Sequence, residues 1–199
     1  MTTRSSWDDA YAEGMRSPWD IGRPQPAFTR LADRGLLSGH VLDAGCGTGE
    51  QALLAASRGA NATGVDGSPR AIGLARAKAA ARNLAARFEV ADVRTLDPAG
   101  IAADTVIDCG LFHVFGDQDR ARYVASLASV LPPGGTCYLM CFSDREPAGF
   151  GPRRVSQDEL RSAFRDGWDV TGIEAGVFEL NPGLPIAAAQ AWLATIRRT

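Results

Sequence analysis

Residues 40 to 50 read HVLDAGCGTGE, and the rest of the chain is organised around this stretch. Val41 and Leu42 form an apolar, strand-like pair, and glycines follow at every second position from Gly45 to Gly49. An amphipathic run with helical spacing starts directly after them. The pattern predicts a strand, a tight glycine loop and the start of a helix. A ligand can lie directly on such a loop, because the backbone carries no side chains there and its amides donate hydrogen bonds.

Two carboxylates flank the glycine loop and restrict what it can bind. A dinucleotide brings a pyrophosphate, and its fingerprint is G-x-G-x-x-G, whereas this chain has G-x-G-x-G. Asp43 precedes the first glycine and Glu50 follows the last, so both are expected to repel a pyrophosphate. A ligand that carries an ammonium and a sulfonium suits the loop better. A nicotinamide-dependent oxidoreductase is the less favoured alternative, and the chain has no Tyr-x-x-x-Lys pair for hydride chemistry.

Two further acidic residues end predicted strands. A strand over residues 62–65 ends at Asp66, whose carboxylate can accept hydrogen bonds from both hydroxyls of a ribose. A strand over residues 87–91 ends at Asp92 and Val93. There the carboxylate can accept from the exocyclic amine of an adenine, and the next backbone N–H can donate to its ring. Together with Asp43, these acids can contact the amino acid, ribose and base of one nucleoside.

The remaining segments predict an α/β sheet that ends in an antiparallel hairpin. Helices are expected over residues 26–34, 50–58, 68–84, 117–130 and 156–166, and strands over 104–109, 136–142, 170–180 and 187–196. Ser68 with Pro69 is expected to open the third helix, and Ser156 with Glu159 to form a capping box. The last two strands are joined by residues 181–185, which is too short for a parallel crossover.

The D-x-G-x-G-x-G pattern resembles motif I of the class I S-adenosylmethionine (SAM)-dependent methyltransferases, and the resemblance extends through VDGSPRAI, ADVRTL, DTVIDCGLFHVF and LPPGG. It implies a Rossmann-like, doubly wound seven-stranded sheet with strand order 3-2-1-4-5-7-6. It also implies SAM as the cofactor, with Asp43 and the glycines at the methionine part, Asp66 at the ribose and Asp92 at the adenine. The expected cofactor contacts are Trp19, Asp43, Gly45, Cys46, Gly47, Asp66, Gly67, Ser68, Asp92, Val93 and Cys109.

The segment after the fourth strand, Gly110 to Phe115, is expected to face the transferring methyl group. Phe112 and Phe115 offer apolar, cation-stabilising walls. His113 is the predicted catalytic residue, as a general base or a substrate-orienting donor. The open alternative is a histidine packed or hydrogen-bonded in the loop without proton transfer. The expected substrate contacts are Phe28, Phe112, Phe115, Phe150 and Arg154.

PWDIGRPQP, GLFHVF and GFGPRRVS resemble the small-molecule methyltransferases of the thiopurine, tellurite-resistance and mycobacterial heterocyclic-toxin types. This resemblance implies methyl transfer to an O, N or S atom of a small aromatic or heterocyclic molecule. A SAM-binding regulator without catalysis is the other alternative. Residues 1–24 are polar, yet they carry Trp7, Tyr11 and Trp19, so we expect them to form a lid arm over the active site. The alternative is an arm that only covers core.

Length, charge and cysteine use restrict the remaining possibilities. The 199 residues fit a single methyltransferase domain spanning 1–199. A net charge of −2 with scattered arginines predicts no nucleic-acid partner. No apolar run of membrane length and no signal peptide is found, so we expect a cytoplasmic protein without membrane contact, as a monomer or weak homodimer. The four cysteines show no metal-site spacing, and no metal is expected.

Overall fold

The computed structural model describes residues 4–13, 17–96, 100–149, 151–182 and 186–199. Its centre is a seven-stranded sheet with strand order β3-β2-β1-β4-β5-β7-β6. The strands are β1 (His40–Ala44), β2 (Asn61–Asp66), β3 (Ala86–Val90), β4 (Thr105–Cys109), β5 (Thr136–Phe142), β6 (Trp168–Glu179) and β7 (Ala188–Arg198). β1 to β5 pair in parallel, and β7 runs antiparallel to both β5 and β6. The predicted order and the antiparallel hairpin are confirmed.

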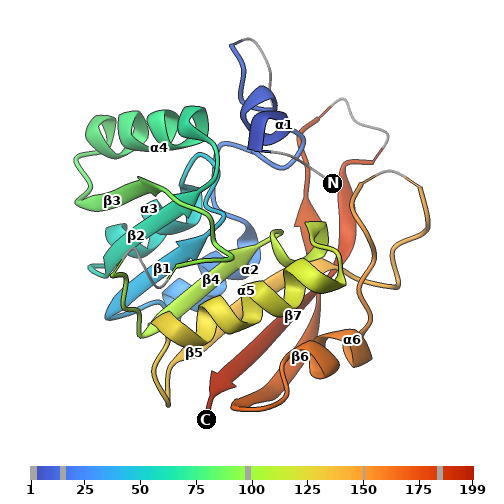
Figure 1. The fold of residues 1–199 in the computed structure, drawn as a ribbon. Coiled ribbons are helices and arrows are strands. Elements are labelled where there is room, and N and C mark those ends of the chain that lie inside the picture. The colour runs from blue at the N-terminus through green and yellow to red at the C-terminus, as the bar shows by residue number, and fades with distance from the viewer. Residues whose placement is uncertain (1–3, 14–16, 97–99, 150, 183–185) are drawn as a thin grey trace.

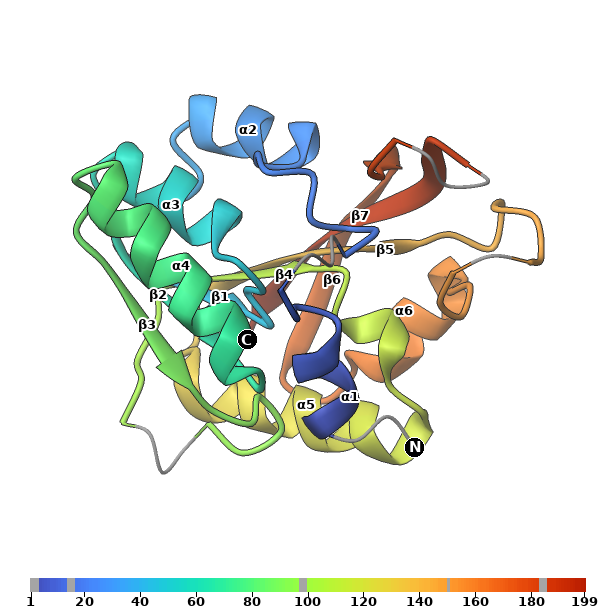
Figure 2. The same cartoon turned by 90° about the horizontal axis from the view of Figure 1, so that it is seen from above.

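Helices cover both faces of this sheet (Figures 1 and 2). One face carries α2 (Pro26–Asp33), α3 (Glu50–Ser57) and α4 (Pro69–Ala81), and the other carries α5 (Asp117–Val130) and α6 (Gln157–Ala163). The predicted N-cap of α4 and the capping box of α6 are both present. α4 ends three residues earlier than predicted, because Asn83 adopts a left-handed φ of 52° that a helix cannot continue through.

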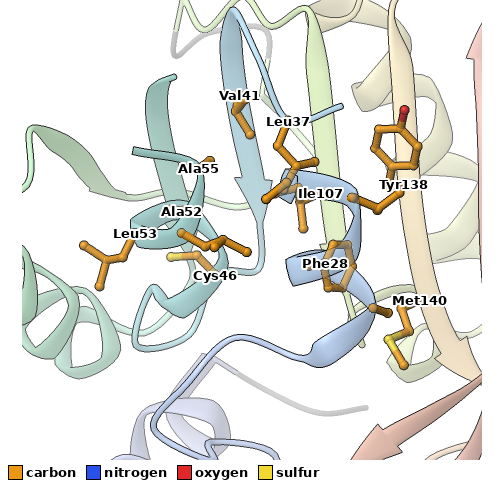
Figure 3. Packing of buried hydrophobic residues seen from close by; sticks show 14 of the residues in the cluster. Phe28, Leu37, Val41, Cys46, Ala52, Leu53, Ala55, Ile107, Tyr138 and Met140 are labelled. Atoms are coloured by element: carbon orange, nitrogen blue, oxygen red, sulfur yellow. The ribbon is translucent and has the colours of Figure 1, made fainter. Parts of the chain in front are cut away.

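Each face of the sheet has its own hydrophobic core. Figure 3 shows the core under α2 and α3, where Phe28 lies close to Ile107 and Met140. The core under α5 and α6 includes Tyr123 and Leu139. β4 and β5 are buried on both faces, as central parallel strands are. They therefore hold the carboxyl edge of the sheet in place, where the glycine loop and the segment after β4 lie.

Two short helices were not predicted. α1 (Arg4–Asp9) lies in the N-terminal segment expected to form the lid arm, and Figure 1 shows it beyond the carboxyl edge of the parallel strands, beside the start of α4. The second is a 3₁₀ turn, η2 (Phe112–Val114), directly after β4. In the described part of the chain, no helix is long and apolar enough to cross a membrane.

Candidate active site

The glycine loop joins β1 to α3 at the carboxyl edge of the parallel strands. Gly45, Gly47 and Gly49 have φ angles of 68°, 52° and 85°, a region that strains residues with a side chain. Their neighbours also approach closely. A Cβ at Gly45 would lie 2.9 Å from Leu111, and one at Gly47 would lie 2.8 Å from the Tyr11 hydroxyl oxygen. Both the backbone conformation and the packing therefore require glycine in this loop.

Asp66, at the end of β2, holds the glycine loop against the start of α4. Its Oδ2 accepts a hydrogen bond from Gly47 N at 2.9 Å, and its Oδ1 accepts from Ser68 N at 2.8 Å. Burial raises the pKa of this carboxyl above its usual value. Asp66 thus lies where a ligand on the loop would meet it, and its contact with a ribose stays a prediction.

Asp43 lies under the same loop and is almost fully buried. Its Oδ2 accepts from Ala52 N at 3.0 Å, while its Oδ1 has no hydrogen-bond partner among the residues that the structure describes. Burial raises the pKa of the Asp43 carboxyl to about 7. A buried carboxylate oxygen without a partner fits a cationic ligand above the loop, because such a ligand favours the charged form. The residues present therefore fit the ammonium and sulfonium of SAM.

Glu50 does not have the role that the sequence predicted. It is buried and paired with Lys78 and Arg82, each at 2.8 Å. Burial alone would raise the Glu50 pKa, but the hydrogen bonds from Arg82 and Lys78 outweigh burial and lower it. Because two cations neutralise Glu50, it does not repel a pyrophosphate at the loop. Of the two flanking acids, only Asp43 discriminates between the candidate ligands.

The end of β3 carries the predicted adenine contacts. Asp92 accepts hydrogen bonds from Arg94 Nε at 2.9 Å and Arg94 Nη2 at 2.7 Å, and Arg94 also pairs with Asp119. Val93 is buried in the core under α5. The Asp92 side chain is about half exposed. An adenine amine would share this carboxylate with Arg94, so the adenine contact stays a prediction.

The N-terminal arm, residues 4–13 and 17–24, is fastened beside the glycine loop at one end. Asp8 Oδ1 accepts from Ser68 Oγ at 2.7 Å and from Arg70 N at 3.0 Å, so it supplements the N-cap of α4. Trp19 Nε1 donates to the Tyr11 hydroxyl at 2.9 Å. This side of the arm therefore lies over the predicted cofactor contacts Gly47 and Ser68.

The other end of the arm is fastened to the glycine loop and to β6. Asp20 Oδ2 accepts from Thr48 Oγ1 at 2.9 Å. Asn181 Nδ2, just after β6, donates to the carbonyl oxygens of Ser17 and Asp20 at 2.6 and 2.7 Å. The arm thus connects the glycine loop after β1 with the segment after β6. The sequence showed the aromatic residues of the arm but not these polar anchors.

His113 lies in η2 and connects this turn to β5. Its Nδ1 accepts a hydrogen bond from Phe142 N at 2.9 Å, which assigns the proton of the neutral ring to Nε2. Burial, and then the positive charge of Arg120, lower the pKa of His113 to about 3. A ring with its lone pair in use and so low a pKa is a poor base near neutral pH. The structure therefore favours the alternative in which His113 transfers no proton.

Asp108 explains why η2 forms after β4. Its Oδ1 accepts from Leu111 N at 2.8 Å, and its Oδ2 accepts from the Tyr123 hydroxyl at 3.0 Å. Burial raises the pKa of Asp108 to about 7. Sequence reasoning missed this residue, because it was counted as part of a buried strand. An acid at the penultimate position of that strand was the available signal.

The predicted substrate contacts divide into buried and accessible residues. Phe28 and Phe112 are fully buried in the two cores, where apolar packing holds them, and their contact with the acceptor stays a prediction. Phe115 is half-buried against Tyr123. Arg154 donates to the carbonyl oxygens of Pro147 and Pro152 and so shapes the loop after β5. Phe150 lies outside the described residues.

Two aromatic rings that the sequence did not single out lie beside His113: Phe142 at the end of β5 and Phe178 near the end of β6. Phe142 and Phe178 have ring centroids 5.6 Å apart, and His113 lies 5.1 Å from Phe142 and 6.2 Å from Phe178. A Cβ at Gly110, the first residue after β4, would lie 3.0 Å from Phe178. We call His113, Phe142 and Phe178 the aromatic cluster. Cys109, a predicted cofactor contact, ends β4 beside it and is half-buried.

The doubly wound sheet with its terminal antiparallel hairpin and its glycine loop after β1 defines the class I methyltransferase architecture. Comparison with known proteins agrees, since the methyltransferase domain family matches residues 41–135. The chain is 38% identical over 161 residues to 2-heptyl-1-hydroxyquinolin-4(1H)-one methyltransferase of Mycobacteroides abscessus, covering 79% of this chain and 71% of that protein.

Two further similarities agree with this assignment. Probable thiol methyltransferase 2 of Arabidopsis thaliana is 30% identical, covering 79% of this chain and 70% of that protein. A solved structure on the conversion of a disulfide bond into a thioacetal group during echinomycin biosynthesis is 38% identical, with a TM-score of 0.90 over 98% of this chain and 93% of that one. The chain belongs to the SAM-dependent methyltransferases.

Proposed function

We propose that this enzyme transfers a methyl group from SAM to an O, N or S atom of a small aromatic or heterocyclic molecule. The observation that carries the proposal is the aromatic cluster, whose three rings are buried together at the sheet edge that carries the glycine loop. Aromatic walls suit a planar acceptor and stabilise a nearby sulfonium. The relatives named for a hydroxyquinolinone and for thiols support acceptors of this chemistry.

SAM, when bound, supplies a methyl group that its positive sulfur already activates for displacement. The chain's own residues then hold and orient the reactants, which is where most of the rate enhancement arises. Asp43, the glycine loop and Asp66 would hold the methionine and ribose parts, with Gly67 and Ser68 at the start of α4 beside them. The arm acts as a lid that excludes water from the site. Its anchors at Ser68 and Asn181 support this role.

The acceptor is activated without a protein base. His113 is held neutral, and its Nδ1 is used by Phe142 N. The guanidinium of Arg120 lies 4.6 Å from the Phe112 ring centroid and adds positive potential beside His113. These features favour an acceptor that ionises readily, such as an acidic hydroxyl or a thiol. His113 then positions the residues around the acceptor through its bond to β5.

The protein is further proposed to act in the cytoplasm as a monomer or weak homodimer on a small molecule instead of a nucleic acid. Its net charge of −2 supports the last point, because nucleic-acid binding needs a basic face.

The proposal is tested by incubating the enzyme with methyl-labelled SAM and a panel of hydroxylated N-heterocycles, phenols and thiols. Labelled methyl in at least one of these acceptor classes is expected, with release of S-adenosylhomocysteine. A peptide and an oligonucleotide serve as controls. SAM binding without transfer to any member of the panel would instead favour the non-catalytic regulator.

A further inference from the structure

Tyr11 occupies a specific place over the glycine loop. Its hydroxyl oxygen lies 2.8 Å from the position that a Cβ at Gly47 would take. The ring is half-buried and makes an edge contact with Trp19 at a centroid distance of 6.4 Å. Gly47 belongs to the part of the loop that motif I assigns to the methionine portion of SAM. The hydroxyl is therefore next to the surface on which that portion would lie.

The Tyr11 hydroxyl accepts one hydrogen bond, and its own O–H group is available to donate another. It accepts from Trp19 Nε1 at 2.9 Å, and among the described residues it donates no hydrogen bond of its own. Burial, and then the negative charge of Asp66, raise the pKa of Tyr11 above its usual value. The phenol therefore keeps its proton throughout the neutral range. A half-buried donor of this kind is stabilised when a ligand supplies the missing acceptor.

Three contacts fix the segment that carries this hydroxyl. Asp8 binds the start of α4 through Ser68 and Arg70, which fixes the chain three residues before Tyr11. Trp19 is joined to Tyr11 directly and packs against Trp7 with ring centroids 5.9 Å apart. The hydroxyl is thus held in place by the arm and by α4 together, as a ligand contact must be.

We propose that the Tyr11 hydroxyl contacts the methionine portion of SAM and so makes the arm part of the cofactor site. The arm then closes on the cofactor itself and is more than a cover for the acceptor. Trp19 acts as a positioning residue, because its indole N–H uses one lone pair of the hydroxyl and so directs the remaining hydrogen toward the loop. The inference rests on SAM dependence and is independent of the acceptor's identity.

The test compares Tyr11→Phe with Tyr138→Phe by calorimetry. Tyr138 lies on β5, in the core under α2 and α3 and away from the glycine loop (Figure 3). Its variant therefore removes a phenol hydroxyl that does not lie at the loop. Loss of one neutral hydrogen bond is expected to weaken S-adenosylhomocysteine binding about 3- to 10-fold in Tyr11→Phe. Tyr138→Phe is expected to bind like the wild type. Intrinsic tryptophan fluorescence, to which Trp7 and Trp19 of the arm contribute, gives a second, activity-independent readout of ligand binding.

A second ligand locates the contact. 5′-Methylthioadenosine keeps the base, ribose and sulfur but lacks the amino-acid group, so Tyr11→Phe should bind it as the wild type does. Circular dichroism and retained binding of this ligand show that the variant is folded. An unchanged affinity for S-adenosylhomocysteine, or an equal loss for both ligands, would overturn the assignment. Absence of SAM binding in the wild type would instead refute SAM dependence itself.

Discussion

At the scale of single residues, the charge state of Asp43 links cofactor binding to pH. Burial raises its pKa to about 7, so below that pH the folded protein holds this carboxyl protonated and neutral. A cationic ligand favours the ionised form. SAM affinity should therefore rise as pH increases through about 7 and level off above it. In Asp43→Asn this pH dependence should be lost, as calorimetry over the same range would show.

A control separates this effect from general changes of the protein. Asp33 lies in an exposed ion pair with Arg58 at the end of α2, so Asp33→Asn removes a carboxylate far from the loop. It should keep the wild-type pH dependence. An Asp43→Asn profile that still rises through neutral pH would show that another group is responsible.

The hydrogen bond at His113 predicts how its replacement affects catalysis. In His113→Asn, the side-chain oxygen can accept the hydrogen bond from Phe142 N, but the ring contact with Phe142 is lost. The turn η2 and the aromatic cluster should therefore shift. We expect a lower kcat with nearly unchanged SAM affinity. The pH at which the rate rises should follow the acceptor's own pKa in both proteins, because no enzyme base is titrated.

The decisive comparison uses two acceptors of different acidity. If the rise of the rate with pH stays at the same pH for both acceptors in the wild type and disappears in the variant, His113 is the base after all. A histidine in the segment after β4 was visible in the sequence. Its protonation depends on a bond to β5 and on burial, which no local pattern reveals.

At the scale of secondary-structure elements, most of the fold followed from sequence. Hydrophobic runs, the N-cap at Ser68 and the capping box at Ser156 predicted the strands and longer helices, because these signals are local. α1 was missed because a long-range contact stabilises it, and η2 because it depends on a strand residue that bonds both to the next turn and to α5. Asp8 bonds to α4, and Asp108 bonds to Leu111 and Tyr123. Glu50 was misread because its partners are distant in sequence: Lys78 lies on α4 and Arg82 directly after it.

The arm gives a prediction at this scale. Deletion of residues 1–24 should leave the sheet and its two cores folded, because the residues of both cores come from later elements. Turnover should fall strongly, and SAM affinity should fall with it. Steady-state rates, calorimetry and circular dichroism of the truncated enzyme would measure the three effects.

A single substitution tests the lid with less disturbance. Asp8→Ala removes the link between α1 and α4 and should reduce turnover in the same direction as the deletion, by a smaller amount. Arg122→Ala, an exposed residue on α5, is the control. Full activity of the truncated enzyme would mean that the arm only covers apolar core.

At the scale of the whole molecule, the fold brings the candidate cofactor and acceptor residues together at one edge of the sheet. β1, β2 and β4 run in parallel, so the glycine loop, Asp66 and the segment after β4 meet there. The antiparallel β6 and β7 bring Phe178 and Asn181 to the same edge. The order of the parallel strands was predictable from sequence. The contacts that Phe178 and Asn181 make at this edge depend on how the N-terminal and C-terminal halves of the chain pack.

The most direct test of SAM dependence compares the heats of binding of SAM and NAD to the wild type and to Asp66→Ala. SAM should bind the wild type, and NAD should give no measurable heat. Asp66→Ala should weaken SAM binding by about 1 to 3 kcal/mol, the cost of leaving hydroxyls without their charged acceptor. Part of that loss comes from freeing Gly47 N and Ser68 N. Binding of NAD in place of SAM, or SAM affinity unchanged by Asp66→Ala, would contradict the assigned cofactor site.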